Sequence, residues 1–312
     1  MPSSPLSWRR GPLTMLLGYL FLGLVPVLVR TARDVGWNAP HTVVARFALA
    51  GVFIVGIGAA RKRWLSANNR WLLVWRGIFG ALAVLLYFTS VQLTGAGVGT
   101  LLNYTYPIWA NVFGAVFLGQ RAFRGFWGLL ALALLGVYLV INPVWSELPS
   151  FGELAGVVSA MLAGAAVLCI KKLRETDDSL SIIWSFSVFG LAFSLPLAVL
   201  DTLRSAKPLP WTDAYGLGLL LLTGVFSFMG HVYFTRGYKH TSLQLGSVLA
   251  LTVPLVAVLS GWWLLDEPLS PTFVAGGLLI VAASAAIGVR DGQAARAAAV
   301  AQAVTSTVRN AP

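Results

Sequence analysis

Long apolar segments recur along nearly the whole chain and alternate with short polar stretches. An apolar run of about 18–25 residues, wound as a helix, crosses the roughly 30 Å hydrocarbon core of a bilayer. The pattern therefore predicts an all-α, polytopic membrane protein with ten transmembrane helices. The expected spans are 13–30, 41–60, 71–91, 95–118, 125–142, 152–170, 180–200, 213–234, 242–264 and 272–289.

The polar stretches between these spans are short and leave no room for an extramembrane domain. We expect an N-terminal tail over 1–12, two five-helix units over 13–142 and 152–289, and a C-terminal tail over 290–312. The tail contains an Ala-rich stretch that is compatible with either a surface helix or disorder. Arg9 and Arg10 before the first apolar run resemble a signal peptide, but the run is long and others follow, so we expect a retained first helix.

The composition agrees with a membrane location, because only 11% of the residues are charged against roughly 25% in soluble domains. The formal net charge is +11, and lysine and arginine favour cytoplasmic loops. An N-terminus inside the cell places most of the basic residues on the cytoplasmic side, so we expect an inner-membrane protein with both termini cytoplasmic. These residues are Arg9, Arg10, Arg61, Lys62, Arg63, Arg70, Arg121, Arg124, Lys171, Lys172, Arg174, Arg236, Lys239, Arg290, Arg296 and Arg309.

This distribution explains the positive charge as an orientation signal facing anionic lipid, so no nucleic-acid partner is expected. Cys169 is the single cysteine, and the three histidines are scattered along the chain. No metal-ligand spacing, phosphate loop or nucleophile–base pair is recognisable in the sequence. We therefore expect no metal, no cofactor and no enzymatic activity.

The two predicted five-helix units resemble each other in sequence. Tyr87-Phe88-Thr89 closes the third span and Tyr233-Phe234-Thr235 closes the eighth, while Pro107 and Pro254 lie at nearly the same offset in the fourth and ninth. A unit with an odd number of spans must be inverted when it is repeated. Inverted repeats are typical of secondary transporters, which bind substrate near the midplane between the repeats; duplication without a functional meaning is the alternative.

Several motifs resemble the drug/metabolite transporter superfamily, and in particular proteins with two EamA domains. They are Ala45-Arg46-Phe47, the stretch from Gly95 through Leu101-Leu102-Asn103-Tyr104 to Pro107, Leu118-Gly119-Gln120-Arg121, and Leu265-Asp266-Glu267-Pro268-Leu269. The resemblance covers about 13–289 and implies a ten-helix transporter of small metabolites. That family usually has Glu where this chain has Gln120, whereas Glu267 keeps it in the second half.

Polar and aromatic residues around the two prolines are the candidates for a substrate cavity. A proline within a span bends the helix and frees a carbonyl, and aromatic rings stack on flat or apolar substrates. Tryptophans at the expected span ends are more typical of interfacial belts. The candidates for the cavity lining are Tyr19, Tyr87, Asn103, Tyr104, Pro107, Trp109, Phe228, Tyr233 and Pro254.

Ionisable residues inside a span are functional candidates by default. Arg46 is an anion contact, an arginine that caps carbonyls of a neighbouring helix, or one whose side chain extends outward to the interface. Arg76 lies near the cytoplasmic end of its span, where we expect its side chain to extend to the interface. His231 has two interpretations. It is either a proton-binding group, since histidine in water titrates near neutral pH, or a hydrogen-bonded packing residue.

No Asp or Glu falls in the middle of an expected span. Ion-coupled carriers usually bury a carboxylate for the ion, so facilitated export or exchange is favoured. We expect an exporter or exchanger of amino-acid-like or amphipathic solutes that works by alternating access. Import or exchange of an anionic metabolite held by Arg46, or lipid flipping, are the alternatives. The expected partners are a small-molecule substrate and the lipid bilayer, and the chain acts as a monomer or homodimer.

Overall fold

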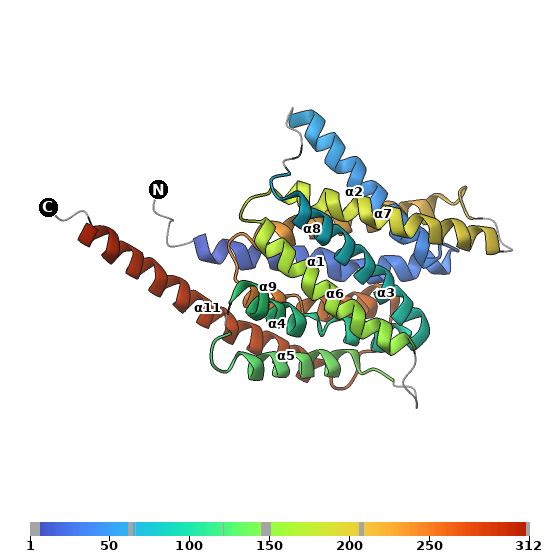
Figure 1. Ribbon diagram of the computed structural model, residues 1–312. Helices are drawn as coiled ribbons and strands as arrows, with labels where there is room; N and C mark the ends of the chain where they lie inside the picture. Colours follow the sequence, from blue (N-terminus) through green and yellow to red (C-terminus); the bar gives the residue numbers. More distant parts are fainter. Residues whose placement is uncertain are drawn as a thin grey trace.

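The computed structural model describes residues 7–61, 65, 67–120, 122–144, 151–205 and 209–309. Within these ranges every regular element is an α-helix, and the helices form an elongated bundle (Figure 1). The helices are α1 Ser7–Asp34, α2 Ala39–Arg61, α3 Arg70–Asn103, α4 Tyr106–Leu118, α5 Phe126–Ile141, α6 Phe151–Leu173, α7 Ser179–Arg204, α8 Ala214–Gly237, α9 Leu243–Leu249, α10 Thr252–Leu265 and α11 Phe273–Arg309.

Eight segments of the described chain are long and apolar enough to cross a membrane. A ninth apolar helix, Phe126–Ile141, is shorter. The prediction of an all-α, multi-pass protein is confirmed, whereas the count of ten spans stays a prediction. The difference arises at the predicted span 95–118, which is not one continuous helix but is divided between the end of α3 and α4.

The helical backbone of α3 reverses its direction near its C-terminal end. The hydroxyl oxygens of Tyr87 and Thr100 are 3.0 Å apart, although a straight helix would separate these residues by about 20 Å. A Cβ added to Gly99 would come within 2.7 Å of the backbone nitrogen of Val91. The chain therefore folds back between Val91 and Gly99, and glycine permits the close approach of the two backbones.

Two interruptions of the helical backbone occupy equivalent places in the two halves. Tyr104 and Thr105 separate α3 from α4, with Pro107 in the first turn of α4. The pair at 250–251 separates α9 from α10, whose first turn contains Pro254. Proline lacks a backbone N–H and tolerates the first turn of a helix, which accounts for helices that begin anew at both places.

The threonines beside the two interruptions behave alike, and the interruptions are themselves linked. Thr105 donates from its hydroxyl to the Leu102 carbonyl at 2.6 Å, and Thr252 donates to the Leu249 carbonyl at 2.7 Å. Asn111 of α4 donates from Nδ2 to the Ser247 hydroxyl of α9 at 3.0 Å.

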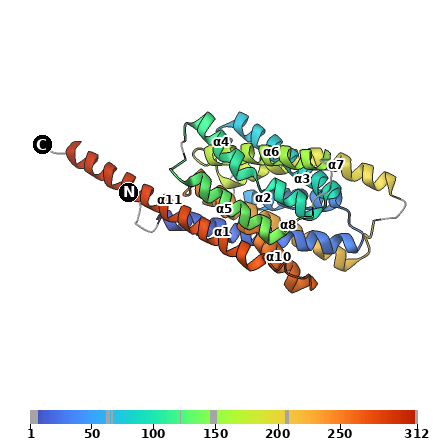
Figure 2. The ribbon, with the colours of Figure 1, turned by 90° about the horizontal axis from the view of Figure 1, so that it is seen from below.

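Helix packing joins the first half of the chain to the second rather than each half to itself. The α3–α6 contact is matched by α8–α1, α3–α7 by α8–α2, and α4–α6 by α10–α1. The α2–α7 and α5–α11 contacts each pair a helix with its own counterpart. The pattern is unchanged when the halves are exchanged, so any site at the centre of the bundle is built by both halves (Figures 1 and 2).

Outward-facing helix surfaces are strongly apolar. Large side chains such as Leu20, Val52, Leu135, Leu221 and Leu278 are exposed at the surface of the bundle, which is costly in water and favourable in a bilayer. Helix α11 continues past the bundle to Arg309 and projects away from it in both views (Figures 1 and 2). The stretch 294–304, for which the sequence permitted either a helix or disorder, is therefore helical.

Candidate functional site

Three basic side chains from three helices lie together within the bundle, and we call Arg46, Arg76 and His231 the buried cationic cluster, although only Arg76 is fully buried and the other two are half-buried. Arg46 of α2 places Nη2 3.0 Å from Nε2 of His231 on α8. An arginine always donates, so this histidine nitrogen accepts the hydrogen bond and the imidazole is neutral. The sequence analysis named both residues separately, and the structure brings them into contact.

Arg76 completes the cluster and corrects one expectation. Its side chain does not extend to the interface: the residue is only 3% exposed, and its guanidinium carbon lies 4.3 Å from the ring centroid of Phe186. A Cβ on Gly80 would collide with the Arg76 guanidinium, so glycine leaves the space that the guanidinium occupies. The reason is geometric, because Arg76 lies on the face of α3 that packs against α7 and not on the lipid face.

Aromatic rings enclose the cluster. Phe186 lies 4.8 Å from Phe47 and 5.1 Å from His231, measured between ring centroids, and Phe234 lies 6.1 Å from His231. Rings of this kind accept a cation over their faces and exclude water, which strengthens every electrostatic interaction inside them.

Neither arginine of the cluster has a carboxylate partner in the part of the chain that the structure describes. No ion pair among the described residues involves Arg46 or Arg76, and Nε and Nη1 of Arg76 are buried without a hydrogen-bond partner in the described chain. Burying an unpaired charge is costly, and the cost falls when a counter-charge arrives. The two guanidinium charges therefore have no counter-charge among the described residues, which favours a small anion beside them.

Tyr87, Asn103 and Tyr104 lie near the folded-back end of α3. Tyr87 contacts Thr100 as described above. Asn103 donates from Nδ2 to the Ser159 hydroxyl of α6 at 2.7 Å, and Ser159 donates in turn to the Ala83 carbonyl. The amide of Asn103 thus ties the end of α3 to α6.

The remaining candidate residues are dispersed through the bundle. Tyr19 is buried and donates to the Gly246 carbonyl at 2.8 Å. Trp109 packs on Gly164 of α6, and Phe228 packs on Phe53 with ring centroids 5.2 Å apart. Pro107 and Pro254 lie at the helix interruptions and, like Trp109, are not brought to the cluster by any described contact.

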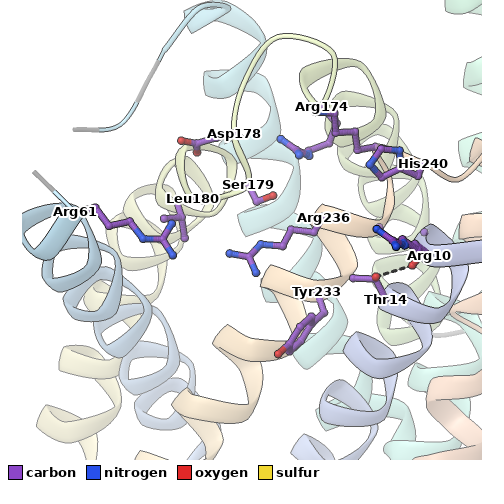
Figure 3. A pocket seen from close by; sticks show the side chains of 13 residues that line it. Arg10, Thr14, Arg61, Arg174, Asp178, Ser179, Leu180, Tyr233, Arg236 and His240 are labelled. Carbon is purple, nitrogen blue, oxygen red and sulfur yellow. Dashed lines mark hydrogen bonds between the residues drawn. The ribbon is translucent and has the colours of Figure 1, made fainter. Parts of the chain in front are cut away.

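A cavity of about 560 Å³ opens at one end of the bundle, and we call it the basic vestibule (Figure 3). Its lining is rich in arginine, and Tyr233, stacked on Phe21 at 6.0 Å, forms part of its wall. The lining residues are Arg10, Gly11, Thr14, Arg61, Arg174, Asp178, Ser179, Leu180, Tyr233, Arg236, Gly237, Lys239 and His240.

Sequence reasoning missed Arg76 and Phe186 as site residues, and it interpreted the vestibule arginines only as orientation signals. Hydropathy does not reveal which side of a helix faces the interior, so Arg76 looked like an interfacial residue. A weak signal existed: Gly77 and Gly80 follow it, and glycines one turn from a long side chain mark a close packing face.

Comparisons with known proteins agree with this architecture. A model described as the EamA-like transporter family matches residues 9–142 and again 150–289. The chain is 27% identical to the pseudopaline exporter CntI of Pseudomonas aeruginosa over 89% of this chain and 96% of that protein. It is also 27% identical to an uncharacterized transporter of Archaeoglobus fulgidus, over 88% and 94%.

One solved crystal structure resembles the whole bundle, with a TM-score of 0.74 at 17% identity, covering 91% of this chain and 98% of the other. At that identity the likeness concerns the fold alone. The family match identifies the family as well as the fold, because it covers most of the chain in two consecutive copies. It agrees with the expected resemblance to the drug/metabolite transporter superfamily. The protein belongs to the EamA-like transporter family: it is a multi-pass membrane protein that transports small molecules and is not an enzyme.

Proposed function

We propose that the protein is a secondary exporter or exchanger of amino-acid-like solutes that carry a carboxylate. The observation that supports this most is the pair formed by the half-buried Arg46 and the buried Arg76, neither of which has an acidic partner among the described residues. A carboxylate that enters beside them would offset one of the two positive charges and accept hydrogen bonds from Nε and Nη1 of Arg76.

The surroundings of the cluster fit the rest of such a solute. Phe47, Phe186 and Phe234 offer apolar faces beside the guanidinium groups, which suit an amphipathic side chain. A substrate of this kind carries its own counter-charge into the membrane. The energetic cost of the empty cluster then favours exchange, because the site is least stable when nothing occupies it.

Alternating access would follow from two inverted repeats of five spans each, with α4 and α10 moving at their interrupted starts. Broken helices near the midplane are a common feature of secondary transporters. The described carboxylates within the candidate spans lie near the ends of those spans, so no acidic group in the middle of a described span supports strong ion coupling. Export is the favoured direction because a relative over nearly the full length is named an exporter.

Uptake or exchange of an anionic metabolite is the second candidate, since the same cluster would hold it. Direction separates the two. Export predicts intracellular accumulation of the solute in a deletion strain, whereas import predicts its depletion.

Counterflow in proteoliposomes tests the proposal. A panel of radiolabelled amino acids and small carboxylates identifies the solute that exchanges. Arg46→Ala should reduce its rate about 100-fold, as expected when one partner of a buried charge pair is lost, and Arg46→Lys should recover part of it. Arg33→Ala, at an exposed arginine of α1, is the matched control. An Arg46→Ala rate equal to that of the control would exclude the proposal.

A further inference from the structure

The basic vestibule is separate from the buried cationic cluster and has a different charge balance. Five arginine and lysine residues line it against one carboxylate, that of Asp178. They come from α1, α2, the α6–α7 connection, α8 and the α8–α9 connection. The cationic lining residues are Arg10, Arg61, Arg174, Arg236 and Lys239.

The side chains converge on one space. Figure 3 shows Arg61, Arg174 and Arg236 projecting from different segments toward the same opening. No ion pair among the described residues involves Arg10, Arg61 or Arg236, and Nε of Arg174 is buried without a partner in the described chain. Like charges gathered around a cavity repel one another and raise the local concentration of anions.

Hydrogen bonds hold the walls of the vestibule in place, so the cations are not simply loose surface residues. Lys171 of α6 donates from Nζ to the carbonyls of Tyr238, at 3.1 Å, and Thr241, at 2.7 Å, which fixes the connection that bears Lys239 and His240. On the other side, Asp177 accepts from the backbone N–H of Asn68 at 2.8 Å. A preorganised site loses less entropy when it binds a ligand.

His240 reports the positive potential of this region. Partial burial lowers the pKa of its imidazole, and the neighbouring charges of Lys239, Arg174 and Lys171 lower it further. Protonation of the neutral His240 imidazole is therefore disfavoured near the lining cations unless an anion is present.

We propose that the basic vestibule is a second anion site, which takes a ligand with phosphate groups and more than one negative charge. Guanidinium groups match phosphate oxygens in pairs, and about 560 Å³ accommodates a small molecule or a lipid headgroup. The ligand would touch Arg10 and Arg61 from the first half of the chain and Arg174 and Arg236 from the second. Its occupancy would thus hold the two halves together at this end and stabilise one conformer.

Inorganic pyrophosphate is the probe. Calorimetric titration and thermal unfolding are performed on the full chain in detergent, so the readout does not depend on transport. The variant Arg61→Gln/Arg236→Gln should bind pyrophosphate at least about tenfold more weakly. The control Arg33→Gln/Arg204→Gln removes two exposed arginines that do not line the vestibule and should bind like the wild type.

Asp178→Asn provides a measurement of opposite sign. Asp178 accepts the Ser181 backbone N–H at the start of α7 at 2.7 Å, and Asn preserves this cap while removing the one acidic charge. Pyrophosphate affinity should rise about threefold. Absence of binding to the wild type, or equal binding by the Arg61→Gln/Arg236→Gln variant and its control, would overturn the proposal.

Two lipid environments distinguish the sources of the phosphate. In nanodiscs of phosphatidylcholine alone, pyrophosphate should bind as it does in detergent. If the natural ligand is a headgroup, phosphatidylglycerol in the nanodisc will compete with pyrophosphate and weaken its binding to the wild type. The weak pyrophosphate binding of the Arg61→Gln/Arg236→Gln variant should not change with the lipid. If the ligand is soluble, both lipids will give the same affinity. The variant Arg46→Ala should retain pyrophosphate binding, so this site and the proposed transport function fail independently.

Discussion

Arginine lies in two regions of this protein under opposite conditions. In the buried cationic cluster, Arg46 and Arg76 lie beside aromatic rings and form no ion pair with any described residue. In the basic vestibule, Arg61 and Arg236 are exposed around an open cavity. Residues of the same charge would therefore meet an anion in a largely apolar interior at one place and in water at the other.

The difference determines what each region contributes. A pair of unit charges at 4 Å interacts by about 1 kcal/mol in water and by about 4 kcal/mol at the effective dielectric of partly buried sites. Salt screens exposed charges over roughly 8 Å at physiological ionic strength. The cluster is therefore suited to selecting a ligand, and the vestibule to attracting or retaining one in a salt-dependent way.

The largest expected effect that sharpens this comparison comes from Arg76→Met, which keeps an apolar stem over Phe186 and removes the charge. Counterflow should fall about tenfold, because hydrogen bonds from a charged donor to the substrate are lost. The thermal midpoint should rise by about 2–4 °C, since an unpaired buried charge is removed. Counterflow and scanning calorimetry on the same preparation measure both.

Arg70→Met, at an exposed arginine of the same helix, is the control and should change neither quantity. A lower thermal midpoint for Arg76→Met would mean that Arg76 stabilises the resting protein and is not held ready for a substrate.

A smaller effect is expected at His231, which accepts from Arg46. His231→Gln keeps an acceptor and should retain most of the counterflow rate. His231→Phe removes the acceptor, leaves Arg46 without its partner and should reduce the rate about fivefold, the worth of one hydrogen bond that orients the guanidinium. Equal rates for the two variants would indicate that the contact does not orient Arg46.

The smallest effect belongs to the vestibule. Pyrophosphate binding should raise the pKa of His240, because a nearby anion stabilises the imidazolium against Lys239 and Arg174. Histidine NMR titration with and without pyrophosphate measures the change, and His240→Gln assigns the signal. An unchanged pKa at saturating pyrophosphate would place the anion away from His240.

Much of the fold was accessible from the sequence because the bilayer imposes simple rules on length and polarity. The apolar runs located the long helices, and Pro107 and Pro254 marked the places where α4 and α10 begin. The fold-back of α3 between Val91 and Gly99 was expected as a loop, and the structure makes it within helical backbone. Small residues such as Gly99 allow the two backbone segments to approach closely. Hydropathy alone does not distinguish such a helical fold-back from a loop.

The candidate site was less accessible, since it depends on which residues from different helices meet. Arg46 and His231 were recognised as ionisable groups inside spans, but nothing in the sequence paired them. Arg76 was assigned to the interface because its position along the helix was known and its direction around the helix was not. Phe186, which contacts both Arg76 and His231, carries no polar signal at all.

The bond between Asn111 and Ser247 has a mechanical consequence. It connects α4 to α9, and so spans the two interruptions of the helical backbone. If the helices move at either interruption, this contact would couple that movement to the other interruption. Movement at two interruptions coupled in this way would change the shape of both halves of the molecule together.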